Sequence, residues 1–258
     1  MIVCLWRIKE VGRYLSSLIV AFSFLASLNC CNPRLVPTQY GYEKTNIEQS
    51  IPPDNKIQGL IKPYKDSLDA IMNRVVVFNE SMLTKKQPES NLGNILCDAM
   101  LRYANACCGK KADAAVLNIG GIRLNQLPAG PVTLGKIFEL MPFENRLVIM
   151  EVKGSELRQL CDFIAGAGGW PVSGLRFVIR SQKAENIQVQ GSPLEPDKLY
   201  YLALSDYLAN GGDKLEMIKG KPFFDTQKNL RDIFIEEFSK LHQEGKQLKG
   251  YLDNRIVD

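Results

Sequence analysis

RLVIMEVKGSELRQLCDFIAGAGG, residues 146–169, contains two different structural patterns in succession. Its first part, Arg146–Val152, is an apolar run with β-branched members, which is typical of a strand packed in a sheet. Its second part, Ser155–Ala165, predicts a helix, and the glycines that follow it predict a turn. The fold must therefore combine strands with helices.

Further elements are predicted on the amino-terminal side of this stretch. Apolar residues recur at three- and four-residue spacing in one segment, and a capping signal at Ser90 and Asn91 precedes another. Pro63 lies within the first of these segments, so that helix either is kinked or begins at the proline. In chain order we expect a helix over 57–72, a strand over 74–78, a helix over 92–103, a strand over 114–117 and a helix over 133–140.

On the carboxy-terminal side we expect two strands and one long helix. The strands are Leu175–Ile179 and Tyr200–Ala203, and the helix runs from about Thr226 to Gln243. One face of that helix carries Leu230, Ile233, Phe234, Phe238 and Leu241. Helices and strands alternate irregularly, which predicts an α+β fold with mixed β-sheets covered by helices.

Composition excludes several classes of protein. The chain has 258 residues, 45% hydrophobic and 23% charged, which is the balance of a globular protein. Its net charge is only +4, and three basic residues and one acidic residue lie in the first 13 positions. The basic stripe that nucleic-acid binding requires is missing, so we expect no nucleic-acid partner.

The amino terminus has the features of an export signal. Arg7, Lys9 and Arg13 precede an apolar run over 14–28, which is short for a membrane span. Cys30 and Cys31 follow directly, in a pattern similar to a bacterial lipoprotein signal in which one of the two cysteines is lipidated. An ordinary signal peptide or a short uncleaved anchor remains an alternative. We expect an exported, membrane-anchored lipoprotein facing the periplasm or the cell surface.

A polar segment separates this signal from the rest of the chain. Residues 32–55 contain four prolines and show no apolar periodicity, as in a flexible tether. The expected organisation is a signal peptide over 1–30, a tether over 31–56 and one folded domain over 57–258.

Five strings in the body, taken together, resemble one family. They are NLGNILCDAM (91–100), LNIGGIR (117–123), LMPFENRLVIMEVKGSELR (140–158), WPVSGLRF (170–177) and LANGGD (208–213). Their order and spacing are similar to those of the carboxy-terminal domain of the 5′-nucleotidase and UDP-sugar hydrolase family. That domain supplies the nucleoside pocket, whereas a separate amino-terminal domain binds two metal ions and activates water.

The resemblance implies five ligand-binding residues. Phe143 and Tyr207 match the two aromatics that stack on the base, and stacking contributes about 1–3 kcal/mol per base. Asn118 matches a residue that contacts the base, and Arg123 matches one that contacts the phosphate-sugar portion. Asp213 matches the carboxylate that binds the ribose hydroxyls. Four glycines are expected to let backbone and ligand approach closely, namely Gly120, Gly121, Gly211 and Gly212.

Two departures from the family pattern limit the expected activity. A two-metal centre needs several histidine and carboxylate ligands, and this chain has one histidine, His242, which we expect at the surface. We therefore expect no catalytic residue, metal site or cofactor in this chain. Family members often carry a basic residue just before the NLGN string, where only Lys85 or Lys86 could substitute here.

These observations favour one hypothesis and leave others open. The favoured hypothesis is a split 5′-nucleotidase, in which this chain binds the nucleotide and a separate metallophosphatase chain brings the divalent metals. The alternatives are a surface-anchored nucleoside- or nucleotide-binding lipoprotein without catalysis and a domain that binds nothing. Nucleophilic chemistry at Cys161 or Cys107 lacks a nearby histidine.

Overall fold

The computed structural model describes residues 41, 44, 52–107, 109 and 111–258. The chain divides into two units, Met1–Asp54 and Asn55–Asp258, and the folded body is the second. The predicted signal segment and both candidate lipidation cysteines lie outside the described residues.

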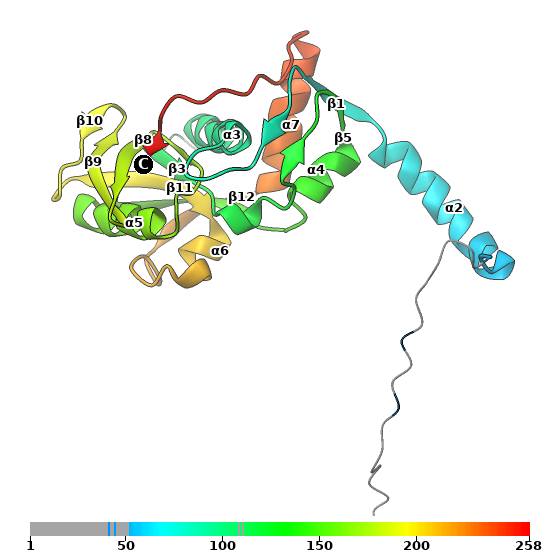
Figure 1. Ribbon diagram of the computed structural model, residues 1–258, viewed down its shortest axis with the longest axis horizontal. Coiled ribbons are helices and arrows are strands. Elements are labelled where there is room, and N and C mark those ends of the chain that lie inside the picture. The colour runs from blue at the N-terminus through cyan, green and yellow to red at the C-terminus, as the bar shows by residue number, and fades with distance from the viewer. Residues whose placement is uncertain (1–40, 42–43, 45–51, 108, 110) are drawn as a thin grey trace, which may run out of the picture. The chain divides into compact units, whose positions relative to one another are not determined.

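The body combines helices with short and long strands (Figure 1). Its helices are α2 (Asn55–Met72), α3 (Asn91–Cys107), α4 (Leu134–Leu140), α5 (Gly154–Gly166), α6 (Asp206–Ala209) and α7 (Leu230–Gln243). Its strands are β1 (Val75–Asn79), β2 (Leu83–Thr84), β3 (Ala114–Val116), β4 (Gln126–Leu127), β5 (Gly130–Thr133), β6 (Arg146–Lys153), β7 (Val172–Ser173), β8 (Leu175–Arg180), β9 (Lys183–Val189), β10 (Ser192–Pro193), β11 (Leu199–Ser205), β12 (Phe223–Asn229) and β13 (Ile256–Val257). Short 3₁₀ turns lie at Ile119–Gly121 and Gly212–Lys214.

A five-stranded sheet forms the centre of the body, with the strand order β12-β6-β11-β3-β7. Strand β6 pairs antiparallel with both β12 and β11, whereas β11 and β3 are parallel. Because the sheet mixes both orientations, the predicted α+β class with mixed sheets is confirmed.

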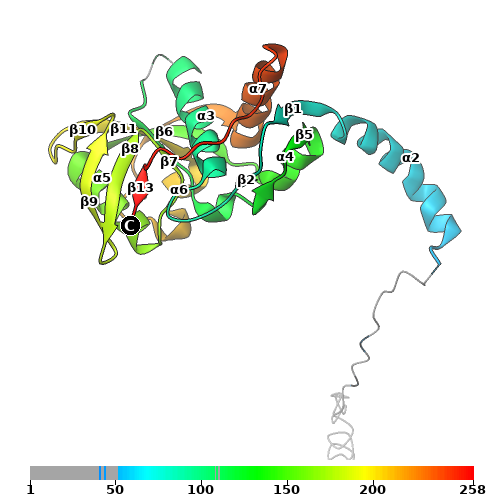
Figure 2. The same cartoon turned by 45° about the horizontal axis from the view of Figure 1, so that its top comes forward.

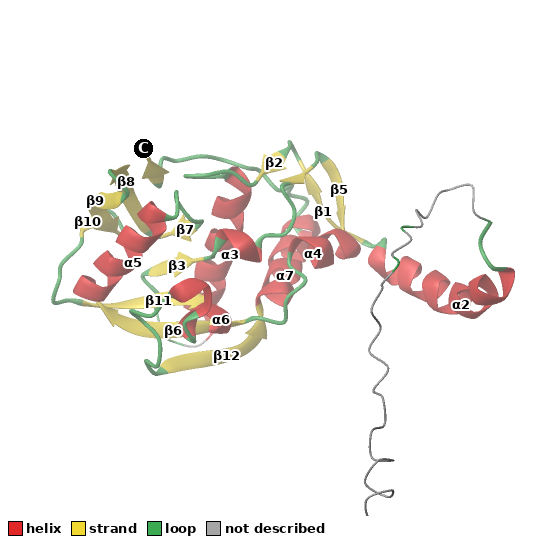
Figure 3. Ribbon diagram, turned by 60° about the horizontal axis from the view of Figure 1, so that its bottom comes forward, coloured by secondary structure: helices red, strands yellow, loops and turns green. Residues whose placement is uncertain are grey.

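Strand β6, which lies between β12 and β11 in the central sheet (Figure 3), contributes to two hydrophobic cores at once. Leu147 and Ile149 join the core that contains α3, α4, α7 and β1. The alternating residues Val148, Met150 and Val152 join the core that contains α5, α6 and the second sheet. Successive side chains of a strand point to opposite faces, so an apolar run that is continuous rather than alternating suits a strand covered on both faces.

The second sheet has four strands in the order β10-β9-β8-β13. Strands β8 and β9 form a hairpin, and α5 packs against β9. Strand β13 at the carboxy terminus adds in parallel to β8, with Ile256 opposite Phe177. The chain reaches it through an extended segment that starts beyond α7 and passes α3 (Figure 2).

Helix α2 forms as predicted, but its apolar side chains are largely exposed, and only Met72 at its end packs against a core. The helix is continuous through Pro63 and has no buried residue. Large apolar side chains such as Leu60, Tyr64 and Leu68 are more than half exposed. Within the described part of the chain, no helix combines the length and the apolar character needed to cross a membrane.

The last helix begins later than predicted. Residues 226–229, expected at its start, belong to strand β12, and α7 starts at Leu230. The Leu230 amide donates to the Asn145 carbonyl, and Asn229 pairs with Arg146 of β6. Residues 226–229 are therefore extended because this segment pairs with β6 in the sheet, and the helix starts only at Leu230.

Candidate functional site at one edge of the central sheet

The five predicted ligand-binding residues lie at or next to one edge of the central sheet. Asn118 follows β3 and Tyr207 follows β11, and these neighbouring strands are parallel, so both residues leave the sheet at the same edge. The antiparallel strand β6 begins at that edge, because Leu147 lies opposite Ser205. Phe143 precedes the start of β6 by three residues. Ligands commonly bind beyond the carboxyl ends of parallel strands.

Asn118, Tyr207 and Asp213 form one hydrogen-bonded cluster. Asn118 Nδ2 donates to Asp213 Oδ2 at 2.6 Å, and the Tyr207 hydroxyl donates to Asp213 Oδ1 at 2.8 Å. The Asp213 backbone N–H donates to the same tyrosine hydroxyl at 3.2 Å. Asn118 is buried, at 5% exposure, whereas Tyr207 is 44% exposed. Hydrogen bonds from Asn118 and Tyr207 thus fix the Asp213 carboxylate, while the Asp213 side chain stays exposed to solvent.

Glycines allow this cluster to close. A Cβ on Gly212 would lie 2.5 Å from Cε1 of Tyr207, and a Cβ on Gly121 would lie 2.8 Å from Oδ1 of Asn118. Gly211 has a φ of 89°, and the only neighbour of a Cβ on Gly120 would be Asn118 Nδ2, at 3.6 Å. Close approach of side chains therefore explains Gly121 and Gly212, whereas backbone conformation explains Gly211.

Arg123 and Phe143 form the second part of the site. The Arg123 guanidinium lies 5.9 Å from the centroid of the Phe143 ring, and the Arg123 amide donates to the Leu140 carbonyl at 2.9 Å. Both side chains are exposed, Phe143 at 39%. Lys85 Nζ donates to the carbonyl of Ile122, the residue before Arg123, at 2.8 Å.

Arg231, which sequence reasoning missed, supports the Phe143 loop. Its side chain is 7% exposed and its guanidinium lies 4.2 Å over the Phe138 ring. Nη1 donates to the carbonyls of Met141 and Phe143 at 3.4 and 3.5 Å, and Nη2 pairs with Glu144. Arg231 lies 88 positions from Phe143, so no local sequence signal indicates this contact.

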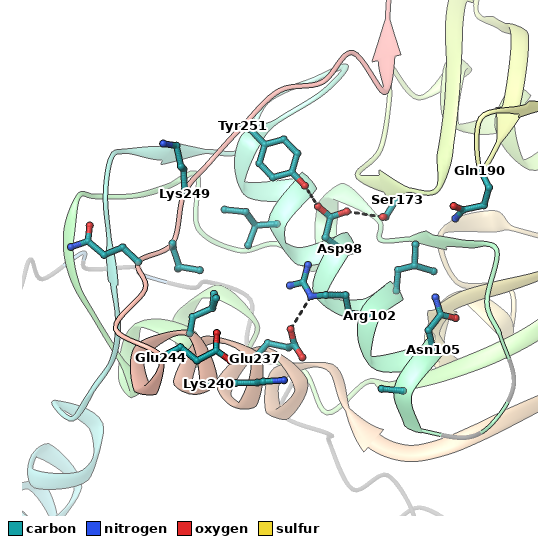
Figure 4. Close-up of a pocket in the computed structure, with 16 residues that line it drawn as sticks. Asp98, Arg102, Asn105, Ser173, Gln190, Glu237, Lys240, Glu244, Lys249 and Tyr251 are labelled. Atoms are coloured by element: carbon teal, nitrogen blue, oxygen red, sulfur yellow. Dashed lines mark hydrogen bonds and ion pairs between the residues drawn. The ribbon is translucent and has the colours of Figure 1, made fainter.

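A large cavity in the described part of the chain lies elsewhere, between α3, α7 and the carboxy-terminal segment (Figure 4). Its volume is about 980 Å³, and none of the five predicted residues lines it. Arg102 and Glu237 form an ion pair across it at 3.0 Å. Its polar residues also include Asp98, Ser173 and Tyr251.

Asp98 is the centre of a polar cluster in this cavity. Arg255 donates to both carboxylate oxygens of Asp98 at 2.7 and 2.9 Å, Ser173 donates at 2.6 Å, and the Tyr251 hydroxyl also donates. Burial raises the pKa of Asp98, but these hydrogen bonds outweigh burial and hold the pKa below its ordinary value. Every partner belongs to the chain, so the cluster fastens the carboxy-terminal segment to α3.

The donor groups of the described residues do not fit a metal centre. Over 52–107 and 111–258, no three histidine, cysteine, aspartate or glutamate side chains gather in a way that could hold a metal ion. His242 is exposed, with its ring 5.7 Å from that of Phe78. Cys97 and Cys161 are free and buried, and burial raises the pKa of Cys161 to about 12, which suppresses the reactive thiolate.

Comparison with known proteins identifies relatives over about four fifths of this chain. Residues 67–220 match the model of the 5′-nucleotidase C-terminal domain. The chain is 29% identical over 238 residues to mouse 5′-nucleotidase, with 81% of this chain and 40% of that protein covered. It is 29% identical over 224 residues to the protein UshA of Yersinia enterocolitica, with 81% and 39% covered.

A solved structure agrees with these relatives. The crystal structure of the 5′-nucleotidase precursor from Thermus thermophilus superposes with a TM-score of 0.66 at 30% identity, over 80% of this chain and 44% of that chain. The fold is thus one found within larger nucleotidases. The chain belongs to the 5′-nucleotidase C-terminal domain family. It spans about two fifths of the length of the curated relatives it matches.

Proposed function

We propose that this chain is the nucleotide-binding half of a split 5′-nucleotidase and that a separate metallophosphatase chain performs phosphate-ester hydrolysis. In this proposal Phe143 and Tyr207 stack on the base, Asn118 contacts it, Asp213 binds the ribose hydroxyls, and Arg123 contacts the phosphate-sugar portion. The divalent metals belong to the partner chain.

One observation carries the proposal. Asn118 lies 95 positions before Asp213 in the chain, yet hydrogen bonds join the side chains of Asn118, Tyr207 and Asp213 at the edge where β6 begins. Phe143 and Arg123 meet beside the start of β6. Two exposed aromatic faces, a carboxylate and a cation are the groups that recognise base, sugar and phosphate.

The chemistry of the side chains supports a separation of nucleotide binding and metal-dependent hydrolysis between two chains. Two-metal hydrolysis requires ligands of suitable type and spacing, and the described residues offer no such group. The curated relatives are more than twice as long as the part of them that this chain matches. In this proposal the metal-dependent step belongs to the partner chain.

The predicted lipidation at Cys30 or Cys31 is part of this proposal, because it would hold the binding half on a membrane surface facing the periplasm or the outside of the cell. Metabolic labelling of the expressed chain with a radioactive fatty acid tests it. Label should be incorporated into the wild type and lost in the C30A/C31A double variant. Equal labelling of the two proteins would reject lipidation at these cysteines.

The proposed function is tested by binding and by reconstitution. The exported chain should bind adenosine or uridine, or their monophosphates, in calorimetric titrations, and Phe143→Ala and Asp213→Ala should each weaken binding by about tenfold or more. Mixing with the metallophosphatase chain and a divalent metal should release phosphate from the monophosphate. The exposed variant Lys62→Ala, in α2, serves as a control that should change neither result.

The outcomes separate the candidate functions. Binding together with phosphate release in the mixture supports the split enzyme. Binding without release in any mixture would replace it with a surface-anchored nucleoside- or nucleotide-binding lipoprotein. A chain that binds none of these ligands would overturn the proposed function altogether.

A further inference from the structure

The turn that carries Asp213 has an unusual backbone. Asp213 has a φ of 51° and Lys214 a φ of 68°, and Gly211 just before them has a φ of 89°. Residues other than glycine adopt this left-handed backbone conformation infrequently, and they keep it only where the surrounding structure supports it. The turn therefore needs contacts that hold it in place.

Tyr207 supplies these contacts. Its ring lies so close to Gly212 that a Cβ there would come within 2.5 Å of the ring. Its hydroxyl accepts from the Asp213 N–H and donates to Asp213 Oδ1. Because the backbone amide uses the acceptor side of the hydroxyl, the hydroxyl hydrogen is directed at the carboxylate.

The carboxylate is held at both oxygens. Tyr207 donates to Oδ1 and Asn118 donates to Oδ2. An ionised carboxylate has about four lone-pair sites, so each oxygen keeps a free site. Two free sites on two fixed oxygens match a pair of neighbouring hydroxyl groups, each of which donates one hydrogen bond.

We propose that Tyr207 is a positioning residue whose hydroxyl, together with the Asn118 amide, orients Asp213 for the vicinal diol of ribose, so that the chain prefers ribonucleosides to 2′-deoxyribonucleosides. The proposal rests on the proposed function, because it concerns the same site. A phenylalanine at this position would retain the stacking face but would leave Oδ1 and the Asp213 turn without their tyrosine contacts. The hydroxyl thus affects binding of the sugar through Asp213, whereas the ring stacks on the base.

The test compares three proteins with three probes. Wild type, Tyr207→Phe and Tyr207→Leu are titrated by calorimetry with adenosine, 2′-deoxyadenosine and adenine, and with the matching uracil series. The wild type should prefer adenosine to 2′-deoxyadenosine by about tenfold, as expected for one hydrogen bond to a charged group. Tyr207→Phe should lose most of this preference, whereas its affinity for adenine should change far less, because the variant keeps the ring that stacks on the base. Tyr207→Leu should weaken binding of all three probes, because it also removes the ring.

The results distinguish failure of this inference from failure of the proposed function. A wild type that binds none of the probes overturns both. A wild type that binds nucleosides without a preference for ribose, or a Tyr207→Phe variant that keeps the full preference, overturns the role of the hydroxyl alone. Thermal unfolding of each variant verifies that it is folded, and Asn118→Ala, which releases the other oxygen, should reduce the same preference.

Discussion

Asp98 and Arg255 lie 157 positions apart in the chain and form a bidentate ion pair, with Nη1–Oδ1 and Nη2–Oδ2 distances of 2.7 and 2.9 Å. Their side chains are 13% and 7% exposed. Replacing Asp98 with Asn leaves the Arg255 charge without its main partner in a largely buried site. We expect the free energy of unfolding to fall by about 3 kcal/mol, measured by urea denaturation.

A matched control for Asp98→Asn is Asp66→Asn. Asp66 pairs with Lys62 at 2.7 Å, but both side chains are more than half exposed. Such surface pairs contribute about 0.5 kcal/mol or less. Equal losses from the two substitutions would show that the Asp98 cluster does not fasten the carboxy-terminal segment.

The same cluster predicts a pH dependence of stability. The pKa of Asp98 in the folded chain lies below its ordinary value of 3.8, which describes the unfolded chain. Its contribution is therefore complete well above pH 4 and is lost as the pH falls through the folded-state pKa. Unfolding followed from pH 7 to pH 2 should show the wild type and Asp98→Asn converging in acid. A difference that stays constant over this range would contradict the prediction.

Arg231→Met should loosen the loop that carries Phe143. The substitution removes the donors to the carbonyls of Met141 and Phe143 while keeping an apolar side chain against Phe138. We expect a loss of about 2 kcal/mol in unfolding free energy and faster hydrogen exchange at residues 143–145. Arg102→Met, at a side chain that is 55% exposed, should produce neither effect.

Gly212→Ala should displace Tyr207, because the added Cβ would lie 2.5 Å from its ring. Steric conflict of this kind costs about 1–3 kcal/mol, and here the exposed ring is the part that can move. Nucleoside affinity measured by calorimetry should fall at least about fivefold. Gly59→Ala in α2, where no atom lies within 4 Å, should leave the affinity unchanged.

Cys161 should resist alkylation in the folded chain. Its thiol is fully buried, and burial raises its pKa to about 12. Iodoacetamide at pH 8 should modify the Cys161 peptide only after denaturation, as detected by mass spectrometry. Rapid labelling of the native chain would revive the hypothesis of a reactive cysteine at this position.

Local sequence pattern was sufficient for the elements that carry their own signal. Arg146–Val152 is mostly apolar and lies within β6, and Ser90 caps α3 by accepting from the Gly93 amide at 3.0 Å. The start of α7 was misjudged because β12 depends on pairing with β6, which no local window contains. Strand β9, KAENIQV, has too many polar residues to stand out, and only its partner β8 defines it.

The candidate site was accessible through family resemblance rather than through pattern. Asn118 and Asp213 are 95 positions apart, so no local spacing of residues in the sequence indicates their hydrogen bond. The contacts of Arg231 and the Asp98–Arg255 pair were missed for the same reason, since each connects segments that are distant in the chain. Tertiary contacts between charged groups are the features that sequence alone conceals.

The double-sided burial of the central strands also determines where the gene can tolerate changes in length. Deleting one residue within β6 or β11 would turn every later side chain of that strand to the opposite face and would move the strand ends that carry Phe143 and Tyr207. The β9–β10 turn at Gly191, where an added Cβ would meet nothing within 4 Å, has no such constraint. Insertions of tags or reporter segments therefore belong at that turn, which lies outside the strands whose register aligns the site.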